Sequence, residues 1–498
     1  MSKFVPKFLY ICTIFTVFLL QYVSLSSQDL NFEDFKKQYS ASYQNYQDSV
    51  NQAFEGFLKA AWIEIAAQKP TASYKKPKPI SLPVAKPLPE GYAKPKPKNK
   101  PSNEQKEAAV PPTPEVLSPK PIKAPVAEPP SSSYGLVFFG KFWEISFLQS
   151  INYIANESTS YNDRYFSDQW KSLQTTYNSE KIDQLKGLLK EQSASDWSSF
   201  LFIQQWINEQ KTIPNTSRDL HLWFLMQQLG YDFRIGYANN KSLVLAAFDQ
   251  SLYGVTFYNF GDKKYYVVQN TKNITGRIKT YDGVIGKELR WMQQVPYTAL
   301  DNQANEERLL KFPFNGEDYE FRVAINPAHI AYQEQFLRSK PELYGWFNPS
   351  DVVIKQLDSA IKPVLSTLTD EEQINFLLAL VQYSFVYQTD DEQFGFEKFM
   401  TPEECLWSAA SDCEDRTALF AWLVNRYTEH DYQFVRYPTH IALAISKKEI
   451  DFKKSKYDAY VDGDNNRTYV VADPTYVGAS FGMEMPKLIN KGTLIHNH

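Results

Sequence analysis

The stretch that decides the fold of the C-terminal part is Ser411-Asp412-Cys413-Glu414-Asp415-Arg416, which is followed by the apolar run Ala418 to Val424. Ser411 or Asp412 can cap a helix, and the apolar run supplies its buried body. A thiol in the first turn of a buried helix faces unsatisfied backbone N–H groups and the positive end of the helix dipole, which favour the thiolate. The pattern therefore predicts a reactive cysteine, Cys413, at the start of a helix over 413–427.

Two later segments carry groups that can complete a catalytic site. His440 begins an alternating strand, and Asp473 ends a later strand at the dipeptide Asp473-Pro474. In an antiparallel sheet that faces the helix, these positions bring an imidazole and a carboxylate to the sulfur in series. Each residue alone has an ordinary structural explanation, but their order in one helix-and-sheet context favours catalysis. We predict Cys413 as nucleophile, His440 as general base and acid, and Asp473 as the group that orients the imidazole.

These segments resemble the three motifs of the transglutaminase-like superfamily, which here read 411–416, 440–444 and 471–476. The resemblance covers about Phe376 to Pro486, and the segments Tyr387 to Asp390 and Met485-Pro486 are similar to its bacterial envelope-associated branch. It implies a papain-like core with the same three residues in the same roles. The superfamily includes protein cross-linkers, peptidases and other amide-cleaving enzymes, so the fold alone does not choose among these activities. Ser411 and Thr439 stand where glycine is common, and both departures bear on access to the site.

An earlier part of the chain repeats the same order of elements. A helix over 218–229 leads into the predicted strands 231–237, 243–247 and 266–270. The interval from Phe233 to Asn270 is 37 residues, and the interval from Phe434 to Asp473 is 39. We interpret this as a second copy of the helix-and-sheet unit, although any α+β protein contains helix–strand–strand runs.

The earlier unit lacks all three reacting groups. Asn270 stands in the place of Asp473, Lys241 or Ser242 replaces the histidine, and Asn215 to Ser217 replaces the cysteine region. We therefore expect residues 134–335 to form a degenerate transglutaminase-like or other α+β scaffold domain, and residues 336–498 to form the catalytic domain. Between the two units, 279–336 is predicted to be rich in strands. Two capped helices follow, one from Ser350-Asp351 and one from Thr369-Asp370 to about Gln388.

The N-terminus has the pattern of an export signal. Lys3 and Lys7 precede the apolar run Phe8 to Leu20, and small residues at 24–27 offer a cleavage site before Gln28. Residues 1–27 are thus predicted to be a cleaved signal peptide, and the protein is predicted to be periplasmic or secreted. The alternative is an uncleaved helix that anchors the protein to the inner membrane.

Two segments follow the leader. Residues 28–68 show apolar positions with an 11-residue repeat, which predicts a long helix. Its narrow apolar stripe should pack on another helix, on a partner or on a second copy of itself. Residues 69–133 hold 17 of the 29 prolines, interleaved with lysines, and predict a disordered, extended spacer.

Composition limits the functions that remain. The net charge of −4 gives no reason to expect nucleic acid as a partner, and three cysteines exclude a disulfide framework and a cysteine-based zinc site. The segment Asp462 to Asn466 is similar to the start of a calcium loop, but Arg467 occupies the position that needs glycine and no glutamate closes the loop, so a hairpin turn is expected there. We predict no cofactor and no metal, an α+β fold, and an exported thiol enzyme that acts on protein or peptide substrates, with peptidoglycan among the candidates. The alternative is a non-catalytic envelope binding or assembly protein.

Overall fold

The computed structural model describes most of the chain, namely residues 32–59, 62–72, 134–149, 151, 161–239, 241–269, 276–281, 289–297, 300, 306–446, 458–463 and 467–495. The predicted signal peptide and residues 73–133 of the predicted spacer lie outside the described residues. None of the helices in the described part is long and apolar enough to cross a membrane.

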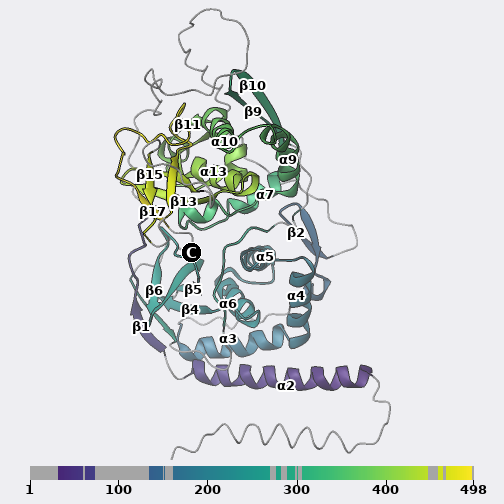
Figure 1. Cartoon of the computed structure of the whole chain (residues 1–498). Coiled ribbons are helices and arrows are strands. Elements are labelled where there is room, and N and C mark those ends of the chain that lie inside the picture. The colour runs from purple at the N-terminus through teal and green to yellow at the C-terminus, as the bar shows by residue number, and fades with distance from the viewer. Residues whose placement is uncertain are drawn as a thin grey trace, which may run out of the picture.

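The first lobe is built on a six-stranded antiparallel sheet (Figure 1). Its order is β1-β8-β4-β5-β7-β6, with bounds β1 Trp62–Ala66, β4 Phe233–Ala238, β5 Lys241–Ala247, β6 Phe257–Phe260, β7 Lys263–Gln269 and β8 Arg277–Tyr281. The edge strands β1 and β6 meet at an antiparallel bridge between Gln68 and Phe257, so the sheet curls back on itself. One face packs a small core around Leu245 and Tyr265, and the other packs against the helices.

Helices surround the other face of that sheet. They are α2 Phe32–Leu58, α3 Asp163–Thr176, α4 Ser179–Glu191, α5 Asp196–Glu209 and α6 Arg218–Gln228, and a small hairpin is formed by β2 Gly135–Phe138 and β3 Lys141–Glu144. The core between them is aromatic: Trp143 stacks on Phe202, and Trp170 lies against Trp223. Helices α5 and α6 are buried over most of their length, in line with the apolar runs Phe200 to Ile203 and Leu222 to Met226 at their centres.

The second lobe is built on a five-stranded antiparallel sheet with the order β15-β16-β14-β13-β17. The strands are β13 Asp431–Tyr437, β14 His440–Ser446, β15 Ala459–Val461, β16 Thr468–Ala472 and β17 Thr493–Ile495. The hairpin β9 Glu306–Phe314 and β10 Glu317–Ile325 and a two-residue parallel pair, β11 Val386–Tyr387 with β12 Ala410–Ser411, complete the strands. The helices are α7 Pro327–Gln333, α8 Pro341–Tyr344, α9 Asp351–Leu365, α10 Asp370–Ser384, α11 Asp390–Gln393, α12 Pro402–Trp407 and α13 Cys413–Tyr427. The predicted α+β class with antiparallel sheets is confirmed.

The two sheets share one strand order. In the first lobe, α6 is followed along the chain by β4 to β8, and these strands lie in the order β8-β4-β5-β7-β6. In the second lobe, α13 is followed by β13 to β17, and these lie in the order β17-β13-β14-β16-β15. Position by position, the connectivity is the same. This agrees with the repeat seen in the sequence; that the first unit is a degenerate copy stays a prediction.

The buried carboxylate of Glu403 connects three segments of the second lobe. Glu403 of α12 accepts hydrogen bonds from the backbone N–H of Ser350 at 2.6 Å and from its hydroxyl at 2.8 Å. It also contacts the ring of His329 and accepts a longer bond, 3.4 Å, from the N–H of Asn326. One side chain thus joins α12 to the start of α9 and to the turn between β10 and α7. The hairpin β9–β10 packs in the core of the second lobe, whereas Tyr332 of α7 packs in the core of the first, so the two cores interleave along the chain between residues 306 and 332. The predicted division at residue 335 stays a prediction.

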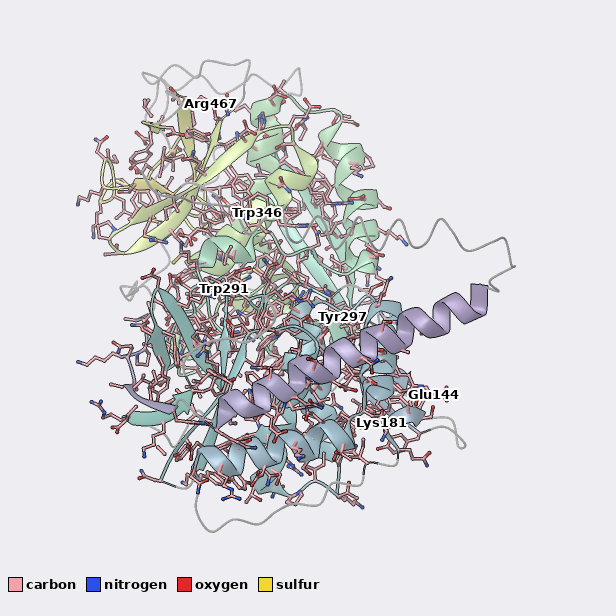
Figure 2. All side chains as sticks on the ribbon, turned by 90° about the horizontal axis from the view of Figure 1, so that it is seen from below. Glu144, Lys181, Trp291, Tyr297, Trp346 and Arg467 are labelled. Atoms are coloured by element: carbon pink, nitrogen blue, oxygen red, sulfur yellow. The ribbon has the colours of Figure 1, made fainter. Side chains whose placement is uncertain are left out.

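The long N-terminal helix is shorter than predicted. We expected 28–68 to be helical, but α2 ends at Leu58 and Trp62–Ala66 forms β1, paired with β8. The alternation of Ile63 and Ile65 in this segment favours a strand over a helix. Phe54 and Leu58 are buried in the first core, and Figure 2 shows α2 from below, lying across the first lobe. The expected packing on another helix is met by α3.

Both flanks of the proline-rich segment are attached to the same lobe. Before it, the carbonyl of Thr71 accepts a hydrogen bond from Gly254 at 3.0 Å. After it, Tyr134 donates to Gln210 of α5 at 2.9 Å, and β2 begins at Gly135. Residues 73–133 therefore connect two parts of one packed lobe. They do not separate a distant helix from the body, as a spacer between independent domains would.

Cutting the proline-rich segment should leave the N-terminal piece in place. With a protease recognition sequence inserted after Lys98, we expect both fragments to elute together from a native gel-filtration column after cleavage. The reason is that β1 keeps its pairing with β8, and Phe54 and Leu58 keep their burial. Ile65→Pro, which removes a backbone donor from β1, should release the fragment. Dissociation of the cleaved unsubstituted chain would contradict this arrangement.

Stability of the first lobe should fall in mild acid because of one buried imidazole. Burial lowers the pKa of His221 to about 3, and Nδ1 of this ring contacts the hydroxyl of Tyr177. Because the folded-state pKa lies below the unfolded value of about 6.5, stabilisation is present above pH 6.5 and is lost as pH falls toward 3. The slope is about 1.4 kcal/mol per pH unit. Urea unfolding of the wild type and His221→Gln should differ in this slope, and parallel curves would refute the assignment.

Candidate active site

Cys413 is the first residue of α13, as predicted, and it is 5% exposed. Asp412 caps the helix, and the carboxylate of Asp415 accepts a hydrogen bond from the N–H of Asp412 at 3.2 Å in a capping box. Three residues after Cys413, the fully buried Arg416 donates to the Phe385 carbonyl at 2.7 Å and to the Ser411 hydroxyl at 3.2 Å. These contacts fasten the start of α13 to the short β11–β12 pair.

His440 and Asp473 form the hydrogen bond that the sequence predicts. Nε2 of His440 lies 2.9 Å from Oδ2 of Asp473, and both side chains are buried. The other carboxylate oxygen of Asp473 accepts the backbone N–H groups of Thr475 at 2.9 Å and Tyr476 at 3.3 Å. Since a carboxylate only accepts, Nε2 carries the proton, and in the neutral ring Nδ1 is then the basic nitrogen. Tyr437 stacks on the imidazole with ring centroids 5.8 Å apart.

One hydroxyl brings the thiol helix and the histidine strand together. Thr417, one turn after Cys413, lies with its Oγ1 2.7 Å from the carbonyl of Cys413 and 3.1 Å from the carbonyl of Ile441. Ile441 is the residue next to His440 on β14. The start of α13 is therefore held against the start of β14, on the element that carries the imidazole. All three predicted site residues lie at this junction of α13, β14 and the end of β16.

The sulfur of Cys413 has a carboxylate neighbour to which the sequence analysis gave no role. Sγ of Cys413 donates to Oε2 of Glu414 at 2.7 Å, and Glu414 is buried. Ligand atoms of Asp412, Cys413 and Glu414 lie within 4.8 Å of one another, as do those of Asp390, Asp412 and Asp415. Carboxylate oxygens are the ligands that hard cations such as Ca²⁺ prefer, so these are the side chains here that could hold one.

Other sequence candidates have structural partners. Gln393, near the site in sequence, donates from Nε2 to the hydroxyl of Ser408 at 3.0 Å. Cys405 is fully buried in α12, and neither Cys405 nor Cys413 is part of a disulfide. Asn270, which stands in the place of Asp473 in the earlier unit, lies outside the described residues. So do residues 464–466 of the predicted turn Asp462 to Asn466.

Two residues that support the site were missed. Gln382 of α10 binds the loop after Asp473, and Thr417 joins α13 to β14. Each is a polar residue that borders an apolar run of a buried helix: Gln382 follows Phe376 to Val381, and Thr417 precedes Ala418 to Val424. A polar residue next to such a run is a usable signal, since buried polar groups need partners.

Comparisons with family models, with curated proteins and with solved structures give no match to this chain.

The two thiols should differ sharply in reactivity. Burial raises the pKa of Cys405 well above its ordinary value, and the charge of Asp415 adds to this effect. In the folded protein at pH 8, we expect iodoacetamide to modify Cys413 and to leave Cys405 intact. Cys405 is expected to react more slowly because the raised pKa lowers its thiolate fraction and its complete burial blocks access of the reagent. Peptide mapping by mass spectrometry measures both sites.

The contrast has internal controls in the same chain. Cys405→Ser should leave the labelling rate unchanged, Cys413→Ala should abolish it, and denaturant should make both cysteines reactive. Equal labelling of the two sites in the folded protein would show that Cys413 is an ordinary buried thiol.

Proposed function

We propose that the protein is an exported thiol enzyme that acts on amide bonds through Cys413, His440 and Asp473. The observation that carries the proposal is the buried hydrogen bond between His440 and Asp473, at 2.9 Å, beside the first turn of the helix that presents Cys413. A carboxylate that fixes the imidazole proton on Nε2 leaves Nδ1 to take the proton of a thiol. The resemblance to transglutaminase-like proteins adds support to the same assignment.

The reaction follows from these groups. Sγ of Cys413 attacks the amide carbonyl carbon while His440 takes the thiol proton, and a carbon–sulfur bond forms. His440 then gives that proton to the leaving nitrogen as the carbon–nitrogen bond breaks. In the second half, water or an amine loses a proton to His440 and attacks the thioester carbon, and the proton returns to the departing sulfur. Asp473 stabilises the imidazolium in both halves.

Water is the default acceptor because it is present at about 55 M, and hydrolysis is therefore the leading form of the activity. A lysine-type amine as acceptor would make the protein a cross-linker. The substrate class is a protein or peptide, with the peptide part of peptidoglycan as a candidate in a periplasmic setting. The export signal predicted at residues 1–27 favours this location, with anchoring to the inner membrane as its alternative.

An activated ester tests the proposal without knowledge of the natural substrate. Mixed with p-nitrophenyl acetate, the chain should release one equivalent of nitrophenol in a burst and carry one acetyl group on Cys413. Cys413→Ala should show no burst, and His440→Ala should acylate slower by about 10²- to 10⁴-fold, the usual contribution of a general base. Intact-mass spectrometry follows the acyl group.

The acceptor is read from the same experiment. Hydrolysis of the acetyl-enzyme at the same rate with and without added cadaverine would identify water as acceptor, whereas transfer of acetyl to cadaverine would identify an amine. A wild-type protein that acylates no faster than His440→Ala would refute the thiol-enzyme proposal.

The second candidate is a binding or assembly protein of the cell envelope. The strand order that the two sheets share favours this candidate. The first unit keeps the framework, although its helix α6 begins with Arg218 and its strand β5 with Lys241, where the second unit has Cys413 and His440. A protein that needed only the framework would keep full biological activity as Cys413→Ala. Loss of activity in that variant would favour the enzyme.

A further inference from the structure

Gln382 of α10 is a buried amide whose hydrogen bonds converge on one loop. It is 3% exposed, and its Nε2 donates to the carbonyls of Asp473 and Ala479, each at 3.0 Å. Its Oε1 accepts the N–H of Gly478, also at 3.0 Å. An amide side chain has two N–H donors and one carbonyl, so every group of Gln382 is used on residues 473–479.

The loop held by Gln382 is the one that carries the catalytic carboxylate. Asp473 follows directly after β16, and its own side chain is divided between His440 and the N–H groups of Thr475 and Tyr476. Gly478 adopts a φ of +78°, a conformation that favours glycine and turns its N–H toward Gln382. The backbone that follows the carboxylate, from the carbonyl of Asp473 to that of Ala479, is thus fixed from α10.

A second residue of the same helix holds the far end of the loop. Oδ1 of Asn375 accepts the N–H of Phe481 at 2.7 Å. Asn375 and Gln382 are seven residues apart, so they lie on the same face of α10. They differ in what they anchor, because Gln382 binds the carbonyl of Asp473 itself and Asn375 binds the chain eight residues later. The helix therefore offers its own matched control.

We propose that Gln382 is a positioning residue that sets the direction of the His440 ring through Asp473. This inference rests on the proposed thiol-enzyme function. The carbonyl of Asp473 belongs to the same residue as the carboxylate that binds Nε2 of His440, so a change at this anchor moves the carboxylate and rotates the imidazole. Nδ1 then no longer points where the thiol proton is to be taken.

Two variants remove the anchor in different ways. Gln382→Glu keeps the shape and the acceptor for Gly478 but loses both N–H donors to Asp473 and Ala479. Gln382→Met keeps the length and loses all three hydrogen bonds, and it serves if the buried charge prevents folding. Asn375→Ala is the matched control, and the thermal midpoint of each full-length variant establishes that it is folded.

Two readouts are measured, one of which needs no substrate. The first is the proton NMR signal of the imidazole Nε2–H of His440, which the bond to Asp473 shifts downfield. The second is the acylation rate of Cys413 by p-nitrophenyl acetate as a function of pH. We expect a Gln382 variant to lose or shift the Nε2–H signal and to acylate about 10- to 100-fold slower, as misplaced catalytic groups do. Asn375→Ala should keep the signal and most of the rate.

The outcomes separate positioning from folding and from the proposed function. An unchanged signal and rate in a folded Gln382 variant would overturn the inference, and so would equal losses in Asn375→Ala. If the wild type is not acylated but a Gln382 variant still shifts the His440 signal, the thiol-enzyme function fails and the positioning role stands.

Discussion

The single O–H of Thr417 is shared between two carbonyls, that of Cys413 at 2.7 Å and that of Ile441 at 3.1 Å, and it joins α13 to β14 at the ends that carry the proposed nucleophile and base. A helix that presents a nucleophile is useful only if its first turn is fixed relative to the base. Here α13 is buried along most of its length, so it cannot turn about its axis without disturbing the core of the second lobe. The contact of Thr417 with Ile441 fixes the position of α13 along that axis relative to β14. The position of the thiol relative to the histidine strand thus follows from packing and from one hydrogen bond.

The same framework occurs in the first lobe without the chemistry. Its sheet has the same strand order, and its hairpin closes at Lys241 where the second lobe closes at His440. The first residue of its helix is Arg218, where the second lobe has Cys413. The shared connectivity with different residues at the junction of helix and sheet indicates that this framework forms without the three residues of the proposed triad.

How much of this was predictable depended on whether the signal was local. The start of α13 at Cys413 and of β14 at His440 follows from capping and alternation, and both were placed correctly from sequence. The strand β1 was missed because a period of two over five residues is weak beside a long helical repeat. Its partner β8 is more than 200 residues away, and Gln382 meets Asp473 across 91 residues. Such contacts follow from topology, which local patterns do not encode.

The charge around the thiol is a further constraint that local patterns hide. Three buried carboxylates lie at the start of α13: Asp412 at the N-cap, and Glu414 and Asp415 in the first turn. The next residue along the chain, Arg416, is a buried cation. Burying carboxylates costs free energy that apolar residues of similar volume would not cost. For Asp412 and Asp415 this cost is offset by capping, since Asp415 accepts hydrogen bonds from the N–H groups of Asp412 and Met400. Glu414 takes no part in the capping box and instead contacts Sγ of Cys413, so it is the carboxylate whose burial the proposed site would explain.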